Sequence, residues 1–253
     1  MGGMDNLLIA LAAGLLGGAI NAIAGGGSFI TFPALVLAGL PPVAANQTGA
    51  IALLPGSLAS TAAYRREIRA FQHARLPLLL ASTLLGGGAG AVLLLVTPTK
   101  IFDLAIPWVV LVGALTFAFG KAIQARVSSV DTPMRPLPVA CFQFVLGAYG
   151  GYFGGAVGIM MMAGWVVLGL GDVRTLNGLK NLMVAAARLA AVLIFAVWGH
   201  VYWHIGLPMM AATVVGGYLG AWVTRFLSAT MLRNIIALIF FAVTAAFFYR
   251  GYA

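Results

Sequence analysis

Two glycine clusters are the part of this sequence best suited to bind an anion. The first is Gly25-Gly26-Gly27 followed by Ser28, the second runs from Gly154 to Gly158, and each precedes a short apolar segment. A helix that begins at such a break directs its first N–H groups and the positive end of its dipole into the gap, and both attract anions. The alternative explanation is close helix packing, for which small residues are favoured in membranes. We predict that these residues bind an anion: Gly25, Gly26, Gly27, Ser28, Gly155 and Gly158.

Four polar residues fall on one face of the apolar segment 173–199, within a sector of about 100° at helical spacing: Asn177, Lys180, Asn181 and Arg188. Arg188 lies about fifteen residues into this segment, which is near the middle of a membrane helix of ordinary length. An arginine at that depth costs several kcal/mol unless it faces the bundle interior, so we predict a functional or gating role for it. Lys180 is closer to the segment's end, where its amine could instead reach the interface.

Segment 43–64 offers an uncharged polar face in the first half of the chain. The residues that share one sector of this segment are Asn46, Ser57, Ser60 and Thr61. Pro55 should kink the helix and free a carbonyl group. Together with the face that carries Arg188, these residues would line a polar cavity with net positive charge, which suits an anion.

The acidic residues all lie in loops or at segment ends: Asp5, Glu67, Asp103, Asp131 and Asp172. Proton-driven pumps commonly place a relay carboxylate at mid-membrane, so coupling through an embedded carboxylate is not expected here. The sequence contains no metal-spaced His/Glu pair, no nucleophile elbow and no complete phosphate-loop motif. We therefore expect no catalytic residues, no metal site and no cofactor.

The composition is that of a membrane protein. Of the 253 residues, 62% are hydrophobic and 8% are charged, whereas a soluble domain has roughly 25% charged residues. The net charge of +9 comes mainly from basic residues in short segments between apolar runs, a pattern that orients helices in a bilayer. The basic residues form no surface stripe of the kind that binds nucleic acid, so we expect a lipid bilayer and no nucleic acid as partner. The lone Cys141 is interpreted as a packing residue.

The apolar runs predict an all-α fold, a polytopic membrane bundle of about eight spans, since about 20 apolar residues cross a bilayer. The expected spans are 6–24, 43–64, 76–97, 101–119, 137–153, 173–199, 204–226 and 230–249. Two further apolar pieces, 28–40 and 158–170, are too short to cross alone and are expected to be discontinuous helices. The first span is interpreted as a membrane helix and not as a removed signal peptide.

A weak internal repeat divides the chain into two halves. Gly25 and Gly39 align with Gly155 and Gly169, and after a one-residue insertion Asn46 aligns with Asn177. Paired breaks at matching places in two halves are typical of the central site of transporters, although chance similarity between helices rich in small residues is the alternative. We expect a first four-span repeat over 1–119, a basic cytoplasmic connector over 120–136 and a second four-span repeat over 137–253.

The basic loops predict the orientation of the first half. Segments 65–75 and 120–136 both carry an excess of Lys and Arg, so both are expected in the cytoplasm. The relation between the halves stays open at this point. They are parallel if each short piece is re-entrant, and inverted if each short piece completes a crossing. Arg225 and Arg233 lean weakly towards inversion.

At the glycine clusters the sequence resembles the TauE/SafE family of sulfite-exporter-like membrane proteins. The first matching stretch is AIAGGGSFITFPALVLAGLPPVAANQTGAIALLPG (22–56), and the second is GGYFGGAVGIMMMAGWVVLGLGDVRTLNGLKNLM (150–183). The resemblance implies a duplicated four-span unit, a bacterial inner-membrane location, and transport of small anions such as sulfite, sulfonates or organic acids. It also implies functional motif positions at Gly25, Gly26, Gly27, Pro33, Asn46, Thr48, Gly155, Gly158, Asn177, Lys180 and Asn181. Ala156 and Val157 interrupt the second cluster, a departure from an unbroken glycine triplet.

We therefore expect a secondary transporter, an exporter, that holds a small anion near mid-membrane between the two repeats. Arg188 and Lys180 would supply charge, and the side chains that would orient the anion by hydrogen bonds are Asn46, Thr48, Asn177 and Asn181. An anion channel and an integral-membrane scaffold subunit with no transported solute are the alternatives. The sequence leaves open which anion is moved, the coupling ion and the oligomeric state.

Overall fold

The computed structural model describes residues 3–70, 76–126, 136–167, 173–223 and 229–252, and within these ranges the chain forms eleven helices and no strand. The predicted all-α fold is therefore confirmed. The helices are α1 Gly3–Ala24, α2 Ser28–Leu37, α3 Pro42–Ala63, α4 Arg65–Ala70, α5 Leu76–Val96, α6 Thr99–Arg126, α7 Pro136–Tyr152, α8 Val157–Val167, α9 Val173–Trp198, α10 Trp203–Val223 and α11 Ala229–Tyr252. A long helix lies at each of the eight expected places, and short helices lie at both expected breaks.

Five of the long helices are long and apolar enough to cross a membrane. These candidate spans are Met4–Ala22, Leu76–Val96, Thr99–Phe119, Gly178–Trp198 and Asn234–Tyr252, within α1, α5, α6, α9 and α11. The helices α3, α7 and α10 have 22, 17 and 21 residues but are not among these five spans. The described residues thus establish a helical bundle with five candidate membrane spans.

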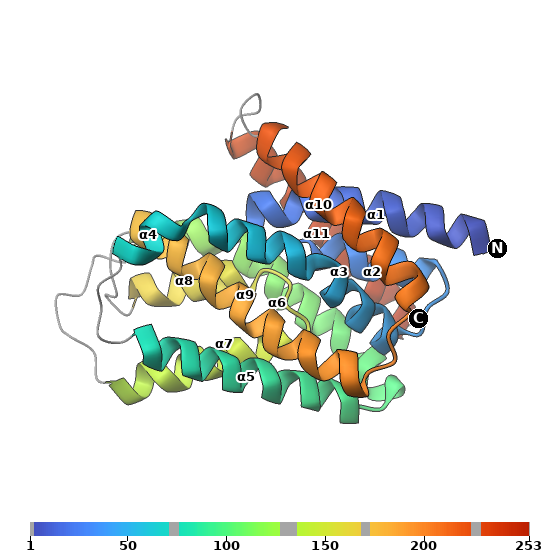
Figure 1. Ribbon diagram of the computed structural model, residues 1–253, viewed down its shortest axis with the longest axis horizontal. Helices are drawn as coiled ribbons and strands as arrows, with labels where there is room; N and C mark the ends of the chain where they lie inside the picture. Colours follow the sequence, from blue (N-terminus) through green and yellow to red (C-terminus); the bar gives the residue numbers. More distant parts are fainter. Residues whose placement is uncertain (1–2, 71–75, 127–135, 168–172, 224–228, 253) are drawn as a thin grey trace.

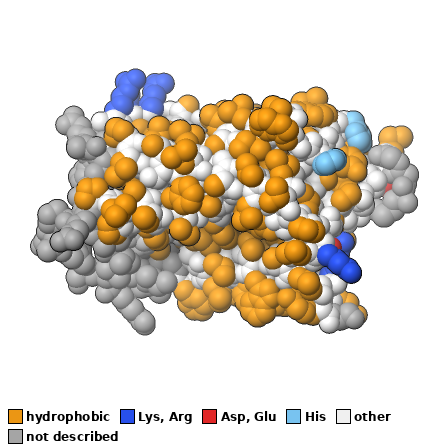
Figure 2. Space-filling view, turned by 90° about the horizontal axis from the view of Figure 1, so that it is seen from below, with side chains coloured by type: hydrophobic (Ala, Val, Ile, Leu, Met, Phe, Trp, Pro, Cys, Tyr) orange, Lys and Arg blue, Asp and Glu red, His pale blue; other side chains and the backbone are white. Residues whose placement is uncertain are grey.

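The surface of the bundle is that of a protein surrounded by lipid. The long helices run along the long axis of the molecule (Figure 1). Large apolar side chains such as Leu85, Val145 and Leu238 are exposed on its flanks. In the face drawn in Figure 2, apolar side chains cover the flank, and Lys, Arg and His side chains lie towards the two ends. This distribution places the membrane around the flank, with the charged ends in water.

Helices from the two halves of the chain pack closely against one another. α1 lies along α10, and α5 lies along α7. Glycine permits both contacts, because a side chain at Gly18 would collide with the backbone of Thr213, and one at Gly90 with the backbone of Ala148. Small residues at such seams are the usual means of close helix packing in a membrane. Packing is thus one use of the many glycines of this chain.

Both predicted glycine breaks are present. α1 ends at Ala24 and is followed by Gly25 with φ of +70°, and α7 ends at Tyr152, two residues before Gly154 with φ of +78°. Left-handed backbone of this kind is accessible to glycine at little cost, which explains the residue type at each break. Figure 1 shows that α1 and α7 begin at opposite ends of the bundle, so the two broken helices enter it from opposite sides.

The two short helices that follow the breaks are held in different ways. In α2, the ring of Phe29 stacks on that of Phe240 in α11 with a centroid distance of 3.7 Å. In α8, the indole N–H of Trp165 donates to Oε1 of Gln143 in α7 at 3.0 Å, and Nε2 of Gln143 donates to Thr83 Oγ1 in α5 at 2.7 Å. Aromatic packing thus fixes one short helix and a buried hydrogen-bond network fixes the other.

Candidate functional site

The candidate site is built around Arg188, which lies in the second half of α9 and is 5% exposed. One nitrogen of its guanidinium, Nη1, makes all three recorded hydrogen bonds. It donates to Ser57 Oγ at 2.6 Å, to Asn21 Oδ1 at 3.3 Å and to the carbonyl oxygen of Leu53 at 3.3 Å. Helices α1, α3 and α9 therefore meet at this side chain.

The local structure of α3 prepares two of these acceptors. The Ser57 hydroxyl donates to the carbonyl of Leu53 one turn earlier, at 3.2 Å, so its lone pairs remain available to Arg188. Pro55 lies inside α3 and has no N–H, so the helix lacks one backbone hydrogen bond in this same turn. The region predicted to be kinked is thus the part of α3 that receives the arginine.

The second guanidinium nitrogen of Arg188 lies at the gap between the two breaks. A Cβ atom added to Gly154 would be 3.8 Å from Arg188 Nη2 and 3.9 Å from Ser28 Oγ. Gly154 belongs to the break before α8, and Ser28 is the first residue of α2. The break before α8 and the first residue of α2 therefore lie beside this nitrogen of the arginine. In the first turn of α2, the N–H groups of Phe29 and Ile30 already donate to the carbonyls of Gly26 and Gly27.

The charge of Arg188 is not neutralised by its recorded neighbours. Its hydrogen-bond partners within the described ranges are a hydroxyl, an amide oxygen and a backbone carbonyl, all neutral. A buried cation without a counter-ion is costly in a membrane, and hydrogen bonds to neutral groups offset only part of that cost. The site is therefore chemically suited to receive a negative charge.

Lys180 lies two turns before Arg188 on α9, about 12 Å away along the helix axis. Its side chain is half-buried and packs over the first turn of α8, because a Cβ at Gly158 would be 3.0 Å from Lys180 Cγ and 3.1 Å from Cδ. Gly154 and Gly158 thus face Arg188 and Lys180 respectively. The second glycine cluster therefore packs directly against the face of α9 that carries both cations.

Several other predicted site residues form hydrogen bonds that connect different helices, with partners other than Arg188. Asn46 Nδ2 donates to the carbonyl of Tyr152 at 2.6 Å and so caps the end of α7 before its break. Thr48 Oγ1 accepts the backbone N–H of Tyr202 at 3.2 Å, ahead of α10. Asn181 contributes its backbone carbonyl, which accepts a hydrogen bond from Thr61 Oγ1 at 3.1 Å. The side chain of Asn177 lies outside the part of the chain that is described.

The remaining predicted glycines are needed for close packing. A side chain at Gly26 would meet the ring of Phe240, and one at Gly155 would meet the ring of Phe29. A Cβ at Gly27 would lie 2.6 Å from the carbonyl oxygen of Gly17 and 2.8 Å from Leu53 Cδ2. Gly25 differs, because its Cβ would face open space and only its positive φ requires glycine. The predicted breaks are thus present and close packing also uses these glycines, while anion binding at the clusters stays a prediction.

Comparison with known proteins identifies the family. The family described as Sulfite exporter TauE/SafE matches residues 10–247, nearly the whole chain. The chain belongs to the TauE/SafE family. Its similarity to this family at the glycine clusters is thereby confirmed, and the match includes both breaks and Arg188.

Curated relatives of this TauE/SafE protein are named as transporters. A "Probable membrane transporter protein" of Haemophilus influenzae is 30% identical over 250 residues, covering 98% of this chain and 96% of the relative. The "Probable membrane transporter protein YfcA" of Escherichia coli K12 is 26% identical over 242 residues, covering 94% and 88%. No solved structure matches the chain. The protein is thus a member of a family of multi-pass membrane transporters.

Two features of this TauE/SafE site were missed from the sequence. Asn21 was overlooked because it is a single polar residue in an apolar helix. Its position one turn before Gly25 could have indicated that it lies near the break. The carbonyl oxygen of Leu53 carries no signal in its side chain at all. Gly154 was recognised as part of a cluster, but not as a residue beside Arg188 Nη2.

Proposed function

We propose that this protein is a secondary transporter that exports a small anion, such as sulfite, a sulfonate or an organic acid, across the bacterial inner membrane. The observation that carries the proposal is the buried guanidinium of Arg188, which is surrounded by neutral partners at the point where two broken helices converge. An anion at Arg188 Nη2 would supply the missing counter-charge. The names of the curated relatives support transport, and the family's description motivates the choice of sulfite as a first substrate.

We further propose that the bundle has eight spans built as two inverted repeats, 1–119 and 137–253, joined by a cytoplasmic connector over 120–136. Three observations support this architecture. Each half has a helix, a break, a short helix and three further long helices. α1 and α7 begin at opposite ends of the bundle (Figure 1). Finally, the first helix of each half packs along the third long helix of the other half, α1 along α10 and α7 along α5.

In this proposal each site residue has a separate role. Arg188 supplies the charge, and Ser28 supplies a hydroxyl donor. The first N–H groups of α8, after Gly154, would contact the same anion from the other side. Asn21 and Ser57 orient the guanidinium, so that its Nη2 edge faces the gap. A binding site at the interface between the repeats can be exposed first to one side of the membrane and then to the other, as alternating access requires.

The test is anion flux in liposomes that contain the purified protein. Radiolabelled sulfite, methanesulfonate and acetate are compared, with and without the substitution Arg188→Gln. We expect saturable uptake and counterflow for at least one anion, with flux lost in the variant while its elution as a folded species in detergent is retained. Flux without saturation or counterflow indicates a channel. Inert wild-type vesicles across the panel contradict transport and favour a scaffold role.

A further inference from the structure

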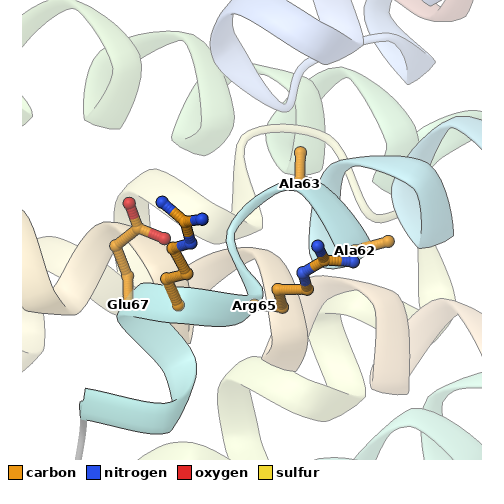
Figure 3. A pocket seen from close by; sticks show the side chains of 5 residues that line it. Ala62, Ala63, Arg65 and Glu67 are labelled. Atoms are coloured by element: carbon orange, nitrogen blue, oxygen red, sulfur yellow. The ribbon is translucent and has the colours of Figure 1, made fainter.

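A second cluster of basic residues lines a pocket at the end of the bundle where α3 gives way to α4. The pocket has a volume of about 600 Å³, and the residues that line it are Ala62, Ala63, Arg65, Arg66 and Glu67. In Figure 3 the Arg65 side chain extends towards Ala62, and Glu67 lies on the opposite side of the pocket. Because two arginines face one glutamate, the lining carries one net positive charge at neutral pH.

This pocket lies at the end of a row of contacts between α3 and α9 that starts at Arg188. The first contact is Arg188 with Ser57 at 2.6 Å. One turn further along α3, Thr61 Oγ1 donates to the carbonyl of Asn181. Beyond it, α4 crosses α9, where a Cβ at Gly178 would lie 2.8 Å from Glu67 Cβ. The pocket is therefore connected to the arginine by one continuous helix pair.

Between Arg188 and this pocket, α9 carries a second cation. Lys180 is half-buried and lies between Arg188 and the contact at Gly178. On the other side of Arg188, α9 continues with apolar residues that include the buried Val192 and Phe195. α3 likewise continues with buried Ile51, Ala52 and Leu53. An anion that leaves Arg188 towards the pocket therefore comes next to the cation of Lys180.

We propose that the pocket at Arg65 and Arg66 is a second anion-binding site, through which the transported anion exchanges between water and Arg188 by way of Lys180. This inference rests on the proposed function, because it concerns the same anion. Basic clefts raise the local concentration of anions, and the effect weakens with ionic strength. Glu67 lowers the charge of the pocket but also packs beside the first turns of α9, where a carboxylate complements the helix dipole. A weak, rapidly exchanging site is therefore expected, in contrast to the buried site at Arg188.

The experiment measures initial rates of radiolabelled sulfite uptake against concentration in proteoliposomes. The double variant Arg65→Gln/Arg66→Gln is compared with Arg250→Gln, which removes an exposed cation from the last turn of α11. We expect KM to rise about 2- to 10-fold in the double variant, the range for two exposed charges, with Vmax unchanged. The salt dependence of KM should also be weaker than in wild type. Arg250→Gln should match wild type in both respects.

Three outcomes overturn the inference. If the KM and salt dependence of the double variant match those of Arg250→Gln, the pocket takes no part in transport. The proposed function is unaffected by that result as long as the wild type shows flux. Wild-type vesicles without flux overturn the proposed function and this inference together. The oxyanion of a lipid headgroup has the same chemistry as the transported anion. Wild type and the double variant are therefore also measured in phosphatidylcholine vesicles with and without phosphatidylglycerol. An effect confined to the anionic vesicles would assign the pocket to a lipid.

Discussion

Arg188 Nη1 lies 2.6 Å from Ser57 Oγ, although 131 residues separate the two in the chain. The two residues occupy corresponding positions in the proposed repeats, so one repeat supplies the charge and the other supplies the acceptor that orients it. On the proposed duplication, the site is therefore asymmetric. A symmetric pair of arginines at this depth would repel one another, whereas an arginine and a serine form a stable pair.

The neighbour of Arg188 in α1 allows a direct test of its charge. We expect Asn21→Asp to place a carboxylate where Oδ1 now lies 3.3 Å from Nη1, and so to neutralise the arginine without any bound anion. Sulfite flux should fall by about 10-fold or more, because one pairing of this kind is worth roughly 1.4 kcal/mol or more. Uptake in proteoliposomes measures this. Asn21→Asp vesicles that transport like wild type would show that the charge of Arg188 is not used.

The two breaks can be compared by the same substitution. Gly25→Ala and Gly154→Ala each force alanine into left-handed backbone, at a cost of about 1–2 kcal/mol. The Gly154 methyl group would lie 2.9 Å from the Gly150 carbonyl oxygen and also between Arg188 and Ser28, whereas that of Gly25 meets nothing within 4 Å. We expect both variants to have a lower melting temperature in detergent than the wild type. Only Gly154→Ala should also have a lower flux per folded molecule. Equal flux per folded molecule in the two variants would contradict the position of the site.

Asn46 is expected to be a structural residue. Asn46→Leu removes the donor to the Tyr152 carbonyl and leaves a buried acceptor unpaired, which costs about 1–3 kcal/mol. The melting temperature should fall, while the KM of the folded fraction should change little because Asn46 is not among the recorded partners of Arg188. Thermal unfolding in detergent gives the melting temperature, and uptake kinetics give KM. An increase in KM with unchanged stability would instead indicate direct contact with the anion.

The seam between α5 and α7 should tolerate no added side chain. Gly90→Val would drive a branched side chain into the backbone of Ala148 and is expected to cost about 1–3 kcal/mol or to prevent folding. Gly88→Val on the same helix is the matched control, since its nearest neighbour there would be Ile194 Cδ1 at 3.6 Å. Yield of folded protein and melting temperature in detergent distinguish the two. Similar behaviour of both variants would mean that this seam is not closely packed.

The helices, the two breaks and the family could all be predicted from the sequence. Hydrophobic length and glycine clusters are properties of contiguous residues, and a helix satisfies its backbone hydrogen bonds within its own segment, so no distant contact is required to identify it. The charged face of α9 followed in the same way from spacing along one helix. Arg188 could therefore be predicted as a site residue before any neighbouring helix was placed.

The partners of Arg188 required the folded chain. Asn21 and Ser57 lie 167 and 131 residues away, and their contact with Nη1 depends on how far each helix is rotated and shifted along its axis. Those positions result from close packing at seams such as Gly18 on Thr213, which no periodicity within one segment encodes. The same reason explains why the contacts of Asn46 and Thr48, two predicted site residues, with Tyr152 and Tyr202 could not be predicted. The spacing of a side chain gives its direction, and only neighbouring helices determine what it meets.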